Sequence, residues 1–483
     1  MRKRKLSTFE RLHRGKFSRK ERQDFQRRLY SDDPGLEIVH RNAAGIDIGN
    51  ESHFVAVPPG QDPQPVREFG SWTADLRRMA TWLKSCGIRT VAMQSTGVYW
   101  IAAYEVLEAE GLEVYLVNAR GTKNLPGRKT DVQECQWLMK LHTYGLLRNS
   151  FRPPEQIRPV RTVWRLRDRH VQEAGRCVQH WQKALTTMNV QLHNAISDLS
   201  GVTGQAIVRA ILAGQRDPGQ LARLRDPRIE ASPEEIAHSL EGHWREDVLF
   251  ELRQAVEAYD FHQQQIAACD RELHKYLTAL PDGEVPAAAG EAAPQAAGER
   301  AGKRPARRAR KPKGHQPNFD IAAEQRRVTG VDLTTIDGID VGIVQTILSE
   351  IGSDLTAWKS EGRFTSWLTL SPQREVSGGK VLHQPRRQGR NRVANALRMG
   401  ASSLERSRSY LGARFRYLKA RLGPPKAVKA MARYLACLVY RMLTRGQAWV
   451  DRGAEHFERK RAELELAALQ RKAAALGMQL VAA

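Results

Sequence analysis

Short apolar runs alternate with amphipathic segments over the first 150 residues of the chain. Four runs rich in β-branched residues predict buried strands, at 44–49, 51–57, 90–93 and 113–118. Apolar residues at helical spacing predict helices over 72–85 and 98–110, and a further helix begins at Asp131. The order of strand, hairpin, helix, strand, helix, strand and helix predicts an α/β domain.

Longer helical periodicity fills the middle of the chain. After the break at Pro153-Pro154, apolar residues recur at helical spacing from 155 to about 197, and again from about 245 to 280. Two long helices joined by a smaller helical insert predict an antiparallel coiled-coil arm, which commonly builds contacts between subunits. An intramolecular helical bundle is the alternative that the same pattern allows.

The rest of the chain divides by composition. Residues 282–317 are mostly Pro, Ala, Gly, Arg and Lys, and so few large apolar side chains predict a flexible basic linker. Beyond it, the stretch from Thr334 to Gly342 and the apolar run after it resemble a helix-hairpin-helix element. In such an element, a glycine turn and a helix N-terminus offer backbone N–H groups to a DNA phosphate.

A chain of 483 residues is too long for one ordinary core, and about three domains are expected. The changes in pattern predict six segments. They are a basic N-terminal arm (1–37), the α/β domain (38–152), a coiled-coil or helical domain (153–281), a flexible basic linker (282–318), a mostly α-helical C-terminal domain (319–452) and a charged helical tail (453–483).

Acidic residues stand close to the ends of the predicted strands. Asp47 lies inside an apolar run, where a carboxylate costs several kcal/mol unless a cation compensates it. Asp131 and Glu134 lie three residues apart at the start of a predicted helix, so their side chains share one face. Acids at strand ends and on a closing helix fit an RNase-H-like sheet. There, carboxylates hold hard cations such as Mg²⁺ for phosphodiester chemistry.

The formal charge of +24 favours a phosphate-bearing partner, because counterion release drives the binding of basic proteins to nucleic acid. An anionic membrane is the competing partner, but no apolar face accompanies the basic runs and no run of about 18 apolar residues predicts a membrane span. The five cysteines are scattered without a C-x-x-C pair, which predicts reduced core thiols. We therefore expect a cytoplasmic nucleic-acid-binding protein with no membrane partner.

Four motifs carry a resemblance to a known family. They are GIDIGNESHFVAV from Gly45, MQSTGVYW from Met93, LVNARGTKNLPGRKTDVQECQWLMKLHTYGLL from Leu116 and LTLSPQREVSGGK from Leu368. In this order, with a long helical section before the last, they resemble the transposases of the insertion sequence 110 and 1111 group. The resemblance covers the chain from Asn42 to about Asp451.

The resemblance implies a RuvC-like domain of RNase-H fold, whose DEDD quartet of acids binds Mg²⁺. The first and third quartet positions fall on Asp47 and Asp131. The second, normally Glu, falls on Gln94, and the fourth, normally Asp, falls on Glu134. Glu134 keeps the charge, whereas the amide oxygen of Gln94 binds Mg²⁺ more weakly than a carboxylate. Either three acids suffice, or a group such as a DNA phosphate completes the shell, or the copy is catalytically impaired.

In the same family, a C-terminal transposase domain supplies a serine nucleophile, which the resemblance places at Ser377. From the residues alone, this Ser before Gly-Gly is a turn residue; the resemblance favours the nucleophile, with Ser371 as the runner-up. Glycines let the backbone approach a phosphate, and cations stabilise the charge of a pentacovalent state. The cations near Ser377 are Arg374, Lys380, Arg386 and Arg387.

The resemblance further implies a recombinase guided by a bridge RNA, which pairs with donor and target DNA and acts as a homo-oligomer, a dimer or a tetramer. Ser377 would attack a phosphodiester and form a phosphoserine link that keeps the bond energy for rejoining. A second group of cations is expected to hold backbone phosphate beside the acids. It consists of Arg120, Lys123, Arg128 and Lys129.

Two other functions compete with this one. Actin-like and sugar-kinase ATPases also open with an Asp-x-Gly loop, which Asp47-Ile48-Gly49 imitates, but the sequence offers no second Gly-rich segment for adenosine and its basic charge fits them badly. The other competitor is a nucleic-acid-binding transposase remnant without chemistry, inactivated at Gln94.

Overall fold

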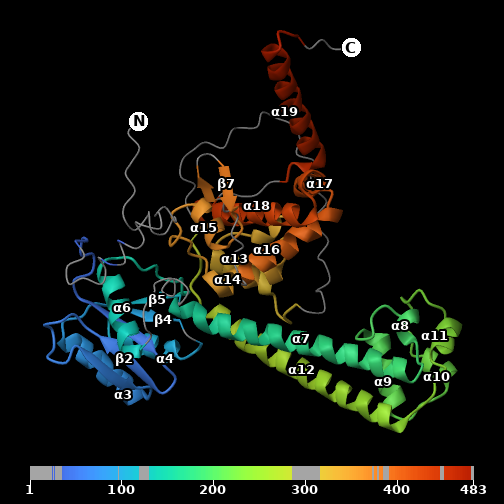
Figure 1. Ribbon diagram of the computed structural model, residues 1–483. Helices are drawn as coiled ribbons and strands as arrows, with labels where there is room; N and C mark the ends of the chain where they lie inside the picture. Colours follow the sequence, from blue (N-terminus) through green and yellow to red (C-terminus); the bar gives the residue numbers. More distant parts are fainter. Residues whose placement is uncertain are drawn as a thin grey trace. The chain divides into compact units, whose positions relative to one another are not determined.

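The computed structural model describes two compact units, which divide between Arg152 and Pro153. The described residues are 24, 27, 35–95, 97–118, 130–284, 316–372, 375–377, 380–383, 391–446 and 451–479, with the backbone alone at 375–377 and 380–383. Each unit is described by itself, and Figure 1 shows the elements of both.

A five-stranded mixed sheet forms the centre of the first unit. Its strands are β1 (Ala43–Ile48), β2 (Ser52–Ala56), β3 (Val66–Gly70), β4 (Thr90–Gln94) and β5 (Glu113–Val117). The strand order is β3-β2-β1-β4-β5, in which β4 runs parallel to β1 and β5, and β2 runs antiparallel to β1 and β3. The predicted strands are confirmed, and the order is consistent with an RNase-H-like fold.

Helices cover both faces of this sheet. They are α3 (Thr73–Ser85), α4 (Trp100–Ala109) and α6 (Asp131–Thr143). Ile46 and Met93 pack with α3 and α4 in one apolar core, whereas Ala92 and Val117 pack with α6 in another. Because successive side chains of a strand point to opposite faces, Asp47 lies on the α6 side of the sheet.

The contact between α6 and β1 is closest at Gly45. A Cβ atom at this position would lie 2.2 Å from both the carbonyl oxygen of Cys135 and the backbone nitrogen of Met139. No side chain fits in that space, so glycine alone allows the helix backbone to rest on the strand. This contact sets how far the first turn of α6 stands from Asp47.

A buried histidine anchors the other end of α6. Nε2 of His142 lies 2.8 Å from the hydroxyl of Thr90, which itself donates to the carbonyl oxygen of Glu113 at 3.1 Å. The imidazole therefore donates through Nε2, and the ring of His40 stacks on it. Burial, helped by the nearby His40, lowers the pKa of His142 to about 3.

A long helical hairpin, here called the arm (158–278), opens the second unit. After the short η1 (Glu155–Ile157), α7 (Arg158–Thr187) and α12 (Glu246–Thr278) pack side by side (Figure 1). Four short helices form the tip between them: α8 (Leu192–Ala195), α9 (Val202–Leu212), α10 (Pro218–Ala222) and α11 (Pro233–Ser239). The prediction that the first long helix continues to about 197 is wrong. The helix ends at Thr187 because Asn189 takes a left-handed φ of 58° and closes the turn.

A buried ion pair joins the two arm helices. Nε of Arg167 lies 2.5 Å from Oδ1 of Asp270. The amide of Asn318 donates to the other carboxylate oxygen of Asp270 at 3.3 Å. Before the gap at 285–315, the amide of Gly283 donates to the carbonyl oxygen of Arg327. The described chain on both sides of this gap therefore packs within the second unit. Residues 285–315, most of the predicted linker, lie outside the described residues.

Helices make up most of the C-terminal part of the second unit. They are α13 (Ile321–Thr329), η2 (Leu333–Thr335), α14 (Val341–Ile351), α15 (Glu361–Trp367), α16 (Arg392–Ser403), η3 (Leu404–Arg406), α17 (Tyr410–Leu422), α18 (Pro424–Arg445) and α19 (Gly453–Ala475). The strands β6 (Glu375–Ser377) and β7 (Lys380–His383) form a hairpin between α15 and α16. No helix within the described ranges is long and apolar enough to cross a bilayer. All five cysteines are buried and free, as predicted.

The predicted helix-hairpin-helix element corresponds to α13, α14 and the turn between them. Gly338 has a φ of 86°, and a Cβ there would lie 2.7 Å from the carbonyl oxygen of Gly400 on α16. The carboxylate of Asp340 already accepts from the amide of Ile343 at 3.1 Å. The turn thus packs on α16 and the helix start is capped by the chain itself, and contact with DNA at this element stays a prediction.

Candidate active site

Three carboxylates and one amide come together where β1 and β4 end. These strands are parallel neighbours, so Asp47 and Gln94 lie side by side at their carboxyl ends. Asp131 and Glu134 come from the first turn of α6, and the amide of Gln94 donates to Oε2 of Glu134 at 3.4 Å. The structure therefore brings together all four residues predicted for the quartet. We call Asp47, Gln94, Asp131 and Glu134 the acidic site.

The local sequence explains why α6 begins at this place. The side chain of Thr130 accepts from the backbone amide of Gln133 at 3.3 Å, which caps the first turn. Asp131 and Glu134 follow within this turn, where the partial positive charge of a helix N-terminus favours carboxylates. Helix capping therefore holds the two acids in position.

The surroundings of Asp47 disfavour the ionised form of its carboxyl group. Burial, followed by the negative charges of Glu134 and then Asp131, raises the pKa of this carboxyl group from 3.8 to about 6. A hydrogen bond from the amide of Ile48 offsets only part of this shift. A half-buried carboxylate beside two other carboxylates favours either a proton or a bound cation.

The buried thiol of Cys135, on α6, is also affected by the negative charge of the acidic site. Burial, together with the charges of Asp47 and Asp131, raises the pKa of this thiol to about 12. The thiol donates to the carbonyl oxygen of Val132 at 3.1 Å. It therefore stays protonated at neutral pH, which makes it neither a metal ligand nor a nucleophile.

The acidic site fits a hard divalent cation in charge and in ligand type, since it offers carboxylate oxygens and one amide oxygen. The raised pKa of Asp47, caused by burial and then by the charges of Glu134 and Asp131, shows that a cation here would be favoured. As the side chains stand, no three His, Cys, Asp or Glu residues in the described part of the chain form a group that would hold a metal ion. Binding a cation would therefore draw the three carboxylates closer together.

The segment predicted to carry the nucleophile is only partly described. Ser377 ends β6, and its backbone pairs with that of Lys380 at the start of β7. Its side chain lies outside the description, as does that of Lys380. The runner-up, Ser371, exchanges a hydrogen bond of 2.9 Å with the hydroxyl of the buried Thr365. This contact gives Ser371 a structural role.

Seven of the eight predicted nucleic-acid-binding cations lie outside the described residues. They are Arg120, Lys123, Arg128, Lys129, Arg374, Arg386 and Arg387.

Sequence reasoning missed Gly45, which determines the dimensions of the acidic site without taking part in its chemistry. A glycine inside a β-branched strand is the signal that would have identified it.

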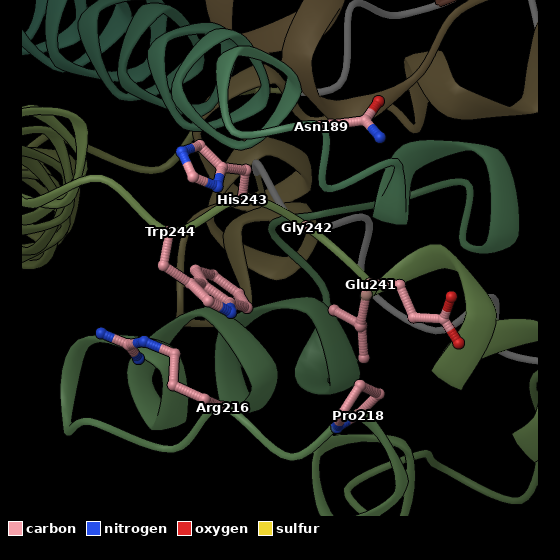
Figure 2. Close-up of a pocket in the computed structure, with 8 residues that line it drawn as sticks. Asn189, Arg216, Pro218, Glu241, Gly242, His243 and Trp244 are labelled. Atoms are coloured by element: carbon pink, nitrogen blue, oxygen red, sulfur yellow. The ribbon is translucent and has the colours of Figure 1, made fainter.

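A pocket of about 470 Å³ opens near the tip of the arm, lined by Arg216, His243 and Trp244 among others (Figure 2). The guanidinium of Arg216 lies 4.8 Å from the centre of the Trp244 ring. It also donates to the carbonyl oxygen of Gln215 at 2.9 Å. Because the guanidinium of Arg216 already makes contacts within the protein, we regard the pocket as part of the packing of the tip.

An acidic site on an RNase-H-like sheet, in a strongly basic chain, is typical of proteins that cut or join nucleic acid. A family model described as a transposase, of the DEDD type of IS110, matches residues 44–190. A second model, described as the transposase of the IS116/IS110/IS902 family, matches residues 332–416. The chain is a transposase. It belongs to the IS110 family, as the two matches in this order indicate.

No curated protein matches the chain. The two family matches leave the ATPase alternative without support, since both describe transposases. The second match ends within α17, so α18 and α19 lie beyond it.

Proposed function

We propose that this transposase is an RNA-guided DNA recombinase that cuts and rejoins strands through a covalent link to Ser377. The observation that carries the proposal is the convergence of Asp47, Asp131 and Glu134 on one edge of the sheet, with the pKa of Asp47 raised by burial and by the two neighbouring acids. Sequence specificity would come from pairing with a bridge RNA, as the family resemblance implies.

Each residue of the acidic site has a distinct role in this proposal. Asp47, Asp131 and Glu134 hold Mg²⁺, and the amide oxygen of Gln94 is an additional weak ligand. Bound Mg²⁺ would neutralise charge on the scissile phosphate and stabilise the oxygen atoms that attack and leave. Ionised Asp47 is the form that binds, so acidification below pH 6 would weaken the site.

The chemical step conserves the number of phosphate ester bonds. The bond between the Ser377 hydroxyl oxygen and phosphorus forms, the bond from phosphorus to the departing sugar oxygen breaks, and one proton moves from the serine to that sugar oxygen. Attack by the hydroxyl of a second strand reverses these changes and restores Ser377. Strands are thus exchanged without ATP.

Charge supports the arm as the contact between subunits. Its 121 residues contain sixteen Lys and Arg and sixteen Asp and Glu, so its net charge is zero in a chain of +24. A neutral surface gives phosphate little to bind, but suits protein contact. Phe250 and Phe261 on α12 are more than half exposed. We expect the arm to join copies of the chain into a dimer or tetramer.

Recombination between a donor circle and a target circle tests the proposed function. Purified protein, Mg²⁺ and RNA that copurifies with it should yield joined products. Ser377→Ala and Asp47→Ala should abolish them, whereas Ser371→Ala should retain them if the fold tolerates the loss of its bond to Thr365. Joined products with Ser377→Ala would contradict the proposal.

A transposase remnant that only binds nucleic acid is the second candidate, and the contact between Gln94 and Glu134 favours it. A neutral amide in this place removes one metal-binding charge. Gln94→Glu restores that charge, so a large gain of recombination in this variant would identify the natural chain as impaired. A rate that stays the same or falls would argue for three acids as a sufficient set.

A further inference from the structure

Residues 406–450 contain eleven Lys and Arg and no Asp or Glu. The whole chain has 53 acidic residues among 483, so a stretch of this length would ordinarily hold about five. The stretch includes α17 and α18, which pack against each other. Within the protein, Glu405 pairs with Lys419 and Glu361 pairs with Arg441, and the positive charge that remains favours an anionic partner.

Three exposed cations in the N-terminal half of α18 lie on one side of the helix. Lys426, Lys429 and Arg433 are exposed and follow the spacing of i, i+3 and i+7, which places them in one row. The opposite side carries buried residues such as Met431 and Leu435. We call Lys426, Lys429 and Arg433 the cationic face.

Packing fixes the cationic face in place. The buried side of α18 rests on α15, α16 and α17. The C-terminal half of α18 is anchored by Arg441, whose guanidinium binds Glu361 at 2.7 and 3.0 Å. The positive charges of Arg445 and Arg433 lower the pKa of the same Glu361. Three arginines therefore act on the carboxylate of Glu361, and Arg441 already forms an ion pair with it.

Side chains alone would recognise an anion here. Pro424 and Pro425 occupy the first two positions of α18, so two of the backbone N–H groups that usually bind anions at a helix start are missing. Among the described residues, no carboxylate forms an ion pair with Lys426 or Lys429. Within the described part of the chain, Lys426 and Lys429 are thus available to an external anion.

We infer that the cationic face binds the phosphodiester backbone of a nucleic acid. From Lys426 to Arg433 the row spans about 10 Å, at 1.5 Å per residue. One strand of a B-form duplex places a phosphate about every 3.4 Å along its axis, so three cations meet about three successive phosphates. The inference rests on the proposed function, and it adds a surface beyond the family matches. DNA and the guide RNA share this chemistry.

Salt dependence of binding tests the inference directly. Full-length wild type is compared with the triple variant Lys426→Gln, Lys429→Gln, Arg433→Gln, using a 30-base-pair DNA duplex and a 30-nucleotide RNA across a series of KCl concentrations. Loss of three phosphate contacts should reduce the slope of log K against log salt by about 2.7 for the duplex and about 2 for the single strand. At 0.15 M salt, duplex binding should weaken about 100-fold.

A matched variant controls for total charge. Lys183→Gln, Arg228→Gln and Lys275→Gln remove the same three charges from exposed positions of the arm, where each pairs with an acid. This variant should keep the wild-type slope, and thermal unfolding should show that both variants are folded. A change for DNA alone or RNA alone identifies which of the two backbones binds.

Three outcomes overturn the inference. The cationic-face variant could keep the wild-type slope for both nucleic acids, in which case an acidic protein becomes the better partner. The arm variant could lose as much affinity, which would reduce the effect to net charge. Wild type could bind neither nucleic acid, which would remove the proposed function together with the inference.

Discussion

The acidic site and the cationic face each gather charge of one sign, yet the protein holds them in opposite ways. The acidic site is half-buried and crowded, so the pKa of Asp47 rises to about 6. The cationic face lies in open solvent on a helix whose other side is packed. Burial therefore makes the charges of the acidic site unfavourable, whereas solvent screens the charges of the cationic face.

This difference in burial indicates which kind of partner each region would bind. A partly buried cluster of carboxylates discriminates by geometry and fits a small, hard ion. An exposed row of cations discriminates little and fits a repeating polyanion whose affinity depends on salt. Changes to the acidic site should therefore alter chemistry and stability, whereas changes to the cationic face should alter binding.

The largest expected effect is a loss of recombination without a loss of nucleic-acid binding. Asp47→Ala should lower recombination by about 1000-fold or more, because a metal ligand is lost where charge develops. Nucleic-acid affinity at 0.15 M salt should stay close to wild type, since the cationic face is intact. Recombination assays and binding titrations on one preparation measure both. Glu110→Ala, at an exposed ion pair with Lys84, is the matched control.

If Asp47→Ala also lost most of its nucleic-acid affinity, the division between chemistry and binding would be wrong. If it recombined DNA at the wild-type rate, the acidic site would have no part in the reaction.

The next effect concerns stability. Folding raises the pKa of Asp47 from 3.8 to about 6, so stability from its protonated form is full below pH 3.8 and is lost as the pH rises through 6. Asp47→Asn cannot ionise. It should be more stable than wild type at pH 7.5, by up to about 3 kcal/mol, and about equal at pH 4. Urea unfolding in EDTA at both pH values measures this difference.

Equal stability of wild type and Asp47→Asn at pH 7.5 would mean that Asp47 carries no strain. Added Mg²⁺ should raise the unfolding temperature of wild type and leave that of Asp47→Asn nearly unchanged.

A smaller effect follows from the closest packing contact. Gly45→Ala places a methyl group 2.2 Å from the backbone of α6, which should cost about 2 kcal/mol and displace the acids of the first turn. Gly175→Ala on α7, where a Cβ meets nothing within 4 Å, should instead be neutral or slightly stabilising. Thermal unfolding of the two variants makes the comparison. Unchanged stability in Gly45→Ala would contradict the packing.

The smallest expected effect lies at the other end of α6. Burial holds the folded pKa of His142 at about 3, against 6.5 for a free histidine, so its contribution is full above pH 6.5 and is lost as the pH falls. In Asp47→Asn, where the opposing carboxyl is absent, stability should fall by about 1 kcal/mol per pH unit between 6 and 5. A flat profile over this range would exclude a buried neutral histidine.

Much of the first unit could be predicted from the sequence. Strands and helices followed from periodicity, and Asp47, Asp131 and Glu134 stood out because acids in an apolar run and at a helix start need a reason. The sequence did not predict the register of the strands or the distance between α6 and β1. The role of Gly45 depends on which face of β1 meets α6, and the hydrogen bond from Gln94 to Glu134 depends on two segments forty residues apart.

The second unit was harder to predict because its signals are not local. The end of α7 depends on the left-handed conformation of Asn189, which periodicity does not reveal. The charge of residues 406–450 was visible in the sequence, but only the packing of α18 shows which cations share an exposed side. The resemblance to the family gave Ser377, which the residues alone would have left as part of a turn.

The identity of the amino acid that becomes joined to DNA tests the central claim most directly. Wild-type protein, its copurified RNA, Mg²⁺ and a nicked donor duplex should give a protein–DNA adduct, whose nuclease-trimmed peptide carries the phosphate on Ser377 by mass spectrometry. The adduct should disappear in both Ser377→Ala and Asp47→Ala. A phosphate mapped to any other side chain, or an adduct that forms equally in Asp47→Ala, would contradict a joint action of Ser377 and the acidic site.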